Sequence, residues 1–152
     1  MLSETQAVSK PAFKPERYPS VMRILIVEDD PQVARLLSRQ LANEGCEVRA
    51  AGSAEEGIRL AGLEHFELIM TDVNLPGMNG LAAIGALKSA GDAPILVMTG
   101  RPDEEFALDA MTLGAIGLIA KPFEPEVFRG ILRDLAQAAV GSNARLDAPP
   151  AI

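Results

Sequence analysis

The chain has few of the residues on which several kinds of protein depend. Its 152 residues include one cysteine, Cys46, and one histidine, His65. A lone cysteine cannot form an intrachain disulfide, which favours a reducing compartment, and a small buried apolar role is the interpretation we give it. With no second histidine nearby, His65 is interpreted as an ordinary loop residue.

Basic residues are outnumbered by acidic ones. Lysine and arginine together number 14 against 21 aspartate and glutamate residues, so the formal net charge is −7. Binding of nucleic acid through a basic face requires clustered lysine and arginine to neutralise phosphates. The sequence therefore argues against direct contact with DNA or RNA.

Long apolar runs are absent as well. None approaches the roughly 20 residues that cross a bilayer. Residues 1–20 carry charges and three prolines, and they lack the apolar centre of a signal peptide. We therefore expect a soluble, cytoplasmic protein without membrane contact.

The hydrophobic content of 48% is enough for one core, and we expect one domain. Residues 1–20 are polar and interrupted by proline, and residues 141–152 contain glycine, serine, asparagine and two adjacent prolines. Such segments bury too little apolar surface to fold, so both are expected to be disordered tails. The folded domain is then 21–140.

Within the domain, short apolar runs typical of buried strands alternate with helical patterns. Strands are expected at 24–27, 46–50, 68–72, 95–99 and 116–120. Helices are expected to begin after Asp30, at Ser53 with Glu56 as a capping box, at Leu81, at Pro102-Asp103 and near Val127. The apolar stripes of these helices include Leu36, Leu63, Phe106, Ala110, Met111, Phe128 and Leu135. Alternation of this kind predicts an α/β fold, a doubly wound parallel sheet of five strands with five helices.

Carboxylates follow two of the predicted strands. Glu28 and Asp29 end the first strand, and Asp72 ends the third. Parallel strands bring these ends to one edge, where such sheets bind ligands. Charges about 4 Å apart repel by roughly 4 kcal/mol at an effective dielectric near 20, so the cluster takes up a proton or a hard cation such as Mg²⁺. The alternative is a set of solvated acids at strand ends.

Two more polar residues complete this edge, and four motifs follow the strands in order. Thr99 ends the fourth strand and Lys121 follows the fifth. The motifs are Val27-Glu28-Asp29-Asp30, Thr71-Asp72-Val73-Asn74-Leu75-Pro76-Gly77-Met78-Asn79-Gly80, Met98-Thr99-Gly100 and Ala120-Lys121-Pro122-Phe123. With them, 21–140 resembles the receiver domain of bacterial two-component response regulators. We predict the flavodoxin-like strand order 2-1-3-4-5.

The resemblance implies that Asp72 is the phosphoacceptor. The phosphoryl donor would be a phosphohistidine on a histidine kinase or a histidine phosphotransfer protein. It also implies a site for Mg²⁺ made by Asp29, Asp72 and the backbone carbonyl of Asn74, with Glu28 acting through water.

Two further roles come with the resemblance. Lys121 would add a positive charge beside the phosphoryl group, and the Thr99 hydroxyl would donate to one of its oxygens. Each residue has a simpler interpretation, because Lys121 could only pair with the acids and Thr99 could bond its own backbone. In the family the peptide bond before the proline of Lys121-Pro122 is typically cis.

One position departs from the family pattern. Receivers commonly carry tyrosine or phenylalanine three residues before the lysine, where Leu118 stands here. Phosphorylation chemistry is compatible with this change, whereas signalling through an aromatic rotamer is not.

The function predicted is that of a response regulator without an output domain, which signals by protein contact with a downstream target or relays the phosphoryl group. It would catalyse only its own phosphorylation and slow dephosphorylation, and in that sense is not an enzyme. One alternative is a receiver-like interaction module that is not regulated by phosphorylation. Another is a small aspartyl-phosphate phosphatase, against which Asn74 stands where a second acid would be needed.

Overall fold

The computed structural model describes residues 21–75, 77–100 and 104–147, which fall into two parts. The larger part, Val21–Pro125, contains the sheet, and the smaller contributes the rest of the last helix. In the described part of the chain, no helix has the length and apolarity needed to cross a membrane.

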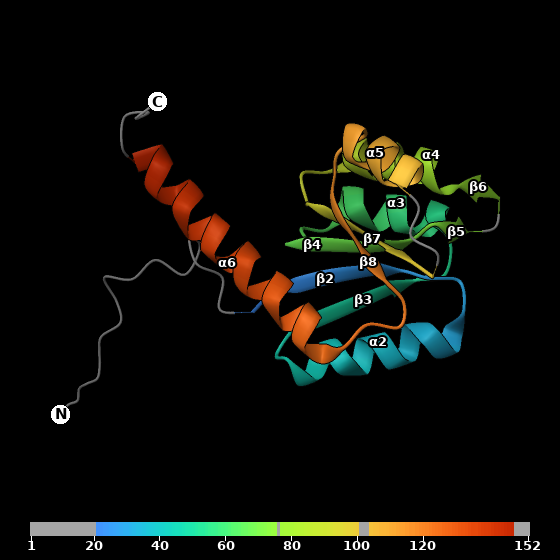
Figure 1. Cartoon of the computed structure of the whole chain (residues 1–152), viewed down its shortest axis with the longest axis horizontal. Coiled ribbons are helices and arrows are strands. Elements are labelled where there is room, and N and C mark those ends of the chain that lie inside the picture. The colour runs from blue at the N-terminus through green and yellow to red at the C-terminus, as the bar shows by residue number, and fades with distance from the viewer. Residues whose placement is uncertain (1–20, 76, 101–103, 148–152) are drawn as a thin grey trace. The chain divides into compact units, whose positions relative to one another are not determined.

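Five parallel strands form one sheet in the order β3-β2-β4-β7-β8. Numbered along the chain this is 2-1-3-4-5, so the predicted order and fold class are confirmed. The strands are β2 Arg23–Val27, β3 Glu47–Ala51, β4 Leu68–Asp72, β7 Ile95–Thr99 and β8 Ala115–Ala120. The sheet is drawn with its labels in Figure 1.

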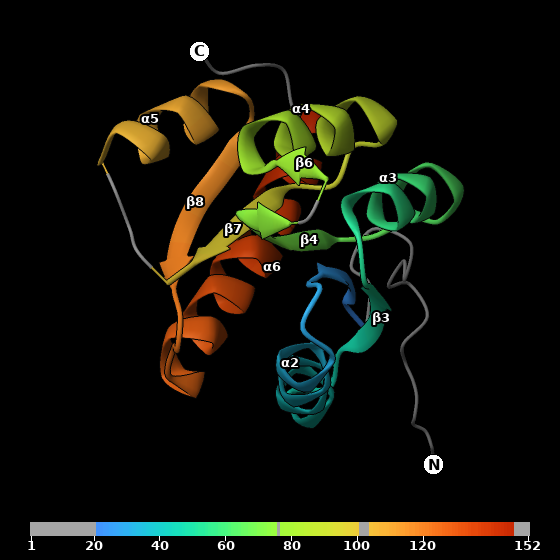
Figure 2. The same cartoon turned by 90° about the vertical axis from the view of Figure 1, so that its right-hand side faces the viewer.

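Helices lie on both faces of the sheet. They are α2 Pro31–Asn43, α3 Ala54–Leu63, α4 Gly80–Ala90 and α5 Glu104–Thr112. Figures 1 and 2 show α3, α4 and α5 together on one face and α2 on the other. The fifth helix, α6, spans Pro125–Asp147. This arrangement is the one expected for right-handed connections between parallel strands.

The core lies between the sheet and the three helices on one face. Strand residues such as Leu25, Ile69 and Val97 are fully buried there against Leu60 of α3 and Leu87 of α4. Burying a leucine, isoleucine or valine side chain contributes about 1.5–3 kcal/mol, so these residues hold the layers together. The central strands can then present their carboxyl ends at fixed positions.

The predicted helix starts are confirmed at two places. The Asp30 carboxylate accepts a hydrogen bond of 2.9 Å from the N–H of Gln32 at the start of α2. At α3 the Ser53 hydroxyl accepts from the N–H of Glu56 (3.1 Å), and the Glu56 carboxylate accepts from the N–H of Gly52 (3.2 Å). These bonds satisfy donors that a helix start leaves without a partner.

Several residues of the predicted apolar stripes are exposed. The exposed fractions are 62% for Leu36, 69% for Leu63 and 49% for Met111. Helical spacing identifies a face without giving its width, and a helix resting on a sheet buries only the residues directly beneath it. Leu63 is also the last residue of α3. The expectation that Leu63 and Met111 are buried was therefore wrong.

Other boundaries differ from expectation or lie outside the description. A short hairpin of β5 Asn74–Leu75 and β6 Met78–Asn79 was not predicted. Helix α6 continues to Asp147, so the backbone of 141–147 is helical where a disordered tail was expected. Propensity is a weak guide there, because single glycine, serine and asparagine residues do not by themselves end a helix. The predicted tails 1–20 and 148–152, and the predicted helix start at 102–103, lie outside the described residues.

Candidate functional site

Four strands of the sheet end at the same edge with polar residues. The registers pair Val27 with Thr71, Asp72 with Met98 and Thr99 with Ala120, so the strand ends are level with one another. Because all of these strands are parallel, the residues that follow them meet at one carboxyl edge. The structure thus brings the residues at these strand ends to one edge of the sheet, as expected.

Three carboxylates gather at this edge. Glu28, Asp29 and Asp72 each have an oxygen within 4.8 Å of an oxygen of the other two. Glu28 and Asp72 are only 3% and 6% exposed, whereas Asp29 is exposed. Two buried carboxylates this close repel strongly unless positive charge lies between them.

Lys121 supplies that charge from the end of β8. Its Nζ donates to Oε1 of Glu28 and to Oδ2 of Asp72, both at 3.0 Å. Burial by itself lowers the pKa of Lys121, but the hydrogen bonds to Asp72 and Glu28 and their negative charges raise it more. The lysine is therefore held in its charged form.

The surroundings of Glu28 favour its neutral form, whereas those of Lys121 favour its charged form. Burial raises the pKa of Glu28, and the charge of Asp72 raises it further. The hydrogen bond from Lys121 and one of 3.2 Å from the N–H of Asp30 to Oε2 of Glu28 lower it in part. The site without a metal ion thus takes up a proton more readily than an exposed glutamate would.

Thr99 lies at the same edge, and Asn74 lies in the segment that follows Asp72. Thr99 ends β7, is 4% exposed, and its carbonyl accepts a hydrogen bond of 2.7 Å from the N–H of Lys121. That bond fixes the backbone from which the lysine side chain extends. Asn74 begins β5 just after Asp72. The roles assigned to Thr99 and Asn74 remain predictions.

The donor set fits a hard cation. Its charged ligand atoms are carboxylate oxygens, which Mg²⁺ and Ca²⁺ prefer, whereas zinc favours histidine and cysteine. His65 lies at the other edge of the sheet, before β4, and pairs with Glu67 at 2.9 Å. A magnesium site formed by Glu28, Asp29 and Asp72 is therefore chemically consistent with the residues present.

Two supporting residues were missed by the sequence analysis. The buried Thr71 hydroxyl donates to the carbonyl of Asp72 at 3.2 Å. At Gly80 an added Cβ would lie 2.7 Å from the carbonyl oxygen of Val73, so only glycine lets α4 begin this close to the segment after Asp72. The sequence features that could have identified them are a hydroxyl residue within an apolar strand and a glycine at the start of a helix.

Lys121-Pro122 is a cis peptide bond, as expected from the resemblance. Residues 24–133 match the family model of the response regulator receiver domain. The chain belongs to this family.

Individual receiver proteins show the same relationship. The transcriptional activator protein PfeR of Pseudomonas aeruginosa is 34% identical over 101 residues, which are 66% of this chain and 33% of PfeR. The solved structure of Vibrio cholerae chemotaxis protein CheY4 has a TM-score of 0.71 and 29% identity, covering 76% of this chain and 99% of that one.

A third relative was solved with a modified site. It is a Burkholderia pseudomallei response regulator with a phosphorylated aspartic acid, a calcium ion and citrate. Its identity is 34% and its TM-score 0.69, with 84% of this chain and 75% of that chain covered. The curated relatives are longer proteins, since this chain spans from 33% to 54% of their lengths.

Proposed function

We propose that this receiver accepts a phosphoryl group on Asp72 from a phosphohistidine of a histidine kinase or histidine phosphotransfer protein. The observation that carries the proposal is the position of Lys121, 3.0 Å from both Glu28 and Asp72 beside a cluster of three carboxylates. A structural salt bridge needs one acid, whereas this arrangement combines a nucleophile, a fixed cation and oxygen ligands for a metal ion.

The reaction is a simple exchange of bonds. An oxygen of Asp72 attacks the phosphorus, an oxygen–phosphorus bond forms, and the phosphorus–nitrogen bond to the donor imidazole breaks. The departing imidazole nitrogen takes a proton from solvent. Asp29, Asp72 and the backbone carbonyl of Asn74 would hold a Mg²⁺ ion, with Glu28 acting through water, and the ion would supply neutralisation of the phosphoryl charge.

Residues of the chain do the remaining work. Lys121 holds the reacting carboxylate in place and offers its ammonium to a phosphoryl oxygen as the group arrives. The Thr99 hydroxyl, at the end of the neighbouring strand, donates to another. Support comes from the Burkholderia pseudomallei relative, whose structure contains a phosphorylated aspartic acid and a divalent cation.

We infer that the phosphorylated form acts through contact with a protein target in the cytoplasm, or passes the phosphoryl group onward. Several curated relatives are transcriptional regulators, but they are longer than this chain. The net charge of −7 disfavours contact with nucleic acid by the present residues. Turnover of a separate substrate is not part of the proposal, because no second acid follows Asp72 at Asn74.

The test is phosphorylation by acetyl phosphate, followed by intact mass and peptide mapping. We expect a mass increase of one phosphoryl group with Mg²⁺, none with EDTA, and the modification on the peptide that contains Asp72. Asp72→Asn should abolish it, and the matched variant Asp109→Asn, at an exposed acid of α5, should not.

Two results would contradict the proposal. One is modification that persists in Asp72→Asn with the label mapped elsewhere. The other is complete failure of the wild-type chain to be modified by acetyl phosphate or by a phosphorylated histidine phosphotransfer protein, which would favour an interaction module independent of phosphorylation.

A further inference from the structure

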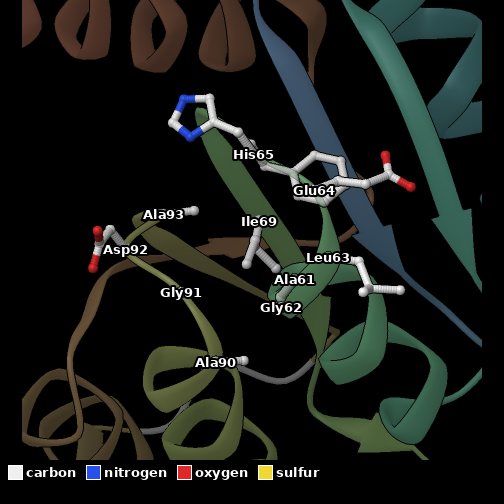
Figure 3. Close-up of a pocket in the computed structure, with 11 residues that line it drawn as sticks. Ala61, Gly62, Leu63, Glu64, His65, Ile69, Ala90, Gly91, Asp92 and Ala93 are labelled. Carbon is white, nitrogen blue, oxygen red and sulfur yellow. The ribbon is translucent and has the colours of Figure 1, made fainter.

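A separate pocket lies at the amino edge of the sheet, opposite the carboxylate cluster. Its volume is about 290 Å³, and its lining comes from residues 61–66 and 90–93, with Ile69 of β4. The two segments are the end of α3 with the loop into β4, and the end of α4 with the loop into β7. Figure 3 shows Asp92 on one side of this pocket and Leu63 on the other.

The ends of two helices converge on this pocket. The carbonyl groups of Ala61, Gly62 and Ala90 accept no hydrogen bond from any described residue. The helices approach closely, because an added Cβ at Gly91 would lie 2.9 Å from the carbonyl oxygen of Ala61. A helix carboxyl end carries a partial negative charge as well as unused acceptors. The pocket is therefore rich in acceptors and electronegative.

Side chains add to this character. Asp92 is exposed at the rim and forms no ion pair with a described residue. Glu64, also in the lining, already pairs with Arg23 at 2.8 Å and Arg49 at 2.6 Å. The lining contains no lysine or arginine, and its one histidine pairs with Glu67. Arg23 already donates to Glu64 and to the carbonyl of His65, so Asp92 and the carbonyl groups at the helix ends remain for a second cation that donates hydrogen bonds.

We propose that this pocket binds an arginine side chain presented by a protein partner. A guanidinium group offers five N–H donors in one plane, which suits several carbonyl acceptors better than an ammonium group does. Ala90 and Ala93, which are half-buried, leave apolar surface for the alkyl part of the side chain. The proposal does not depend on the chemistry at Asp72.

A polypeptide fits better than a free cation because of Leu63. This side chain is 69% exposed beside the pocket, although it is large and apolar. A residue next to the bound arginine can cover it, whereas a free small cation would leave it in water. The partner segment is therefore expected to place an apolar residue beside its arginine.

The experiment titrates the ¹⁵N-labelled protein with a blocked tetrapeptide, acetyl-Ala-Leu-Arg-Ala-amide. We expect concentration-dependent shifts of the amide signals of Gly62, Gly91 and Asp92. The same peptide with citrulline in place of arginine, which is neutral and nearly the same shape, should bind at least about ten-fold more weakly. Equal binding of the two peptides, or shifts confined to the carboxyl edge around Asp72, would overturn the proposal.

Two variants locate the binding within the pocket. Asp92→Asn should weaken binding of the arginine peptide about two- to five-fold, because the charge is exposed. Asp109→Asn, an exposed acid outside the pocket, should have no effect. Gly62→Leu should abolish binding by filling the mouth, and a Cβ at Gly62 comes no closer than 3.8 Å to Ala90. Unchanged binding in both pocket variants would rule the site out.

Discussion

Lys121 compensates the negative charge of the buried carboxylates when no metal ion is bound. Its two hydrogen bonds of 3.0 Å join Glu28, just after β2, to Asp72, the last residue of the neighbouring strand β4. A buried carboxylate that loses its cation retains the full cost of its desolvation. In the proposed reaction, the same residue would serve stability before phosphorylation and charge neutralisation during it.

Replacing Lys121 by methionine should leave Glu28 and Asp72 facing each other. We expect the free energy of unfolding at pH 7 without metal to fall by about 1–3 kcal/mol. The raised pKa of Lys121 means that its contribution in the wild type is present at neutral pH and is lost only in alkaline solution. Urea denaturation measures the loss, and Mg²⁺ should stabilise Lys121→Met more than it stabilises the wild type.

The control is Lys88→Met, which removes an exposed lysine of α4. It should change the free energy of unfolding by less than about 0.5 kcal/mol. If Lys121→Met is as stable as this control in metal-free buffer, the two carboxylates do not repel and the electrostatic account of the site fails.

Asp29 should behave differently, because it is exposed and carries a charge of the same sign as its neighbours. Asp29→Asn removes a proposed metal ligand and relieves repulsion. Without metal, the free energy of unfolding should stay the same or rise by up to about 1 kcal/mol, while phosphorylation by acetyl phosphate with Mg²⁺ should be lost. A variant that unfolds without metal would show that this acid has a structural role instead.

At the scale of elements, Arg23 joins the amino ends of β2 and β3 to the carboxyl end of α3. Its guanidinium donates to Glu47 of β3 at 3.0 Å, to Glu64 after α3 at 2.8 Å and to the carbonyl of His65 at 2.7 Å. It also lies over the ring of Phe66, 5.1 Å from the centroid. The starts of β2 and β3 and the end of α3 are thus fixed beside the pocket at the amino edge of the sheet.

The hydrogen bond from Arg23 lowers the pKa of Glu64, with a further contribution from Arg49. A carboxyl group with a lower pKa in the folded state stabilises the protein above its unfolded pKa, and this contribution is lost as the pH falls through the folded value. Glu64→Gln should therefore lower the melting temperature at pH 7. The difference from wild type should begin to shrink below about pH 4, the ordinary range of a glutamate, and disappear at a lower pH where Glu64 is protonated in the folded state as well.

Thermal unfolding monitored by circular dichroism between pH 3 and pH 8 tests this expectation. Asp109→Asn serves as the control, since it removes an exposed acid of α5 without touching Arg23 or Arg49. If the melting temperature of Glu64→Gln is lower than that of the wild type by the same amount at every pH, the effect comes from packing and not from charge.

At the scale of the whole molecule, the site could be predicted because it depends only on where parallel strands end. Glu28, Asp72 and Lys121 follow apolar runs, and the sheet topology brings them together whatever the details of packing. The Arg23 interactions and the pocket beside Gly91 depend instead on which helix ends meet, which no local pattern encodes. The exposure of Leu36 was missed for a similar reason, since spacing does not give the width of a contact.

Transmission of a signal from the site to the surface is also a property of the whole fold. Leu118 lies in β8 opposite Val97 of β7, is half-buried, and packs against the core under α3, α4 and α5. It has no ring or hydroxyl group with which to exchange a buried for an exposed position. We therefore expect activation to change the segment that follows Thr99 more than the surface around Leu118.

Amide shift mapping with Mg²⁺, with and without beryllofluoride, measures this response. The largest shifts should fall at Thr99, Gly100 and the first turn of α5, and those of residues 116–118 should be small. Leu118→Tyr should leave the rate of phosphorylation by acetyl phosphate within a few-fold, because the hydrogen bonds that position Lys121 go to Glu28 and Asp72 and do not involve residue 118. In that variant the response should extend into β8, since a tyrosine ring can move between the core and the surface. A wild-type response centred on β8, with quiet signals from Thr99 and Gly100, would show that leucine transmits the change as an aromatic residue would.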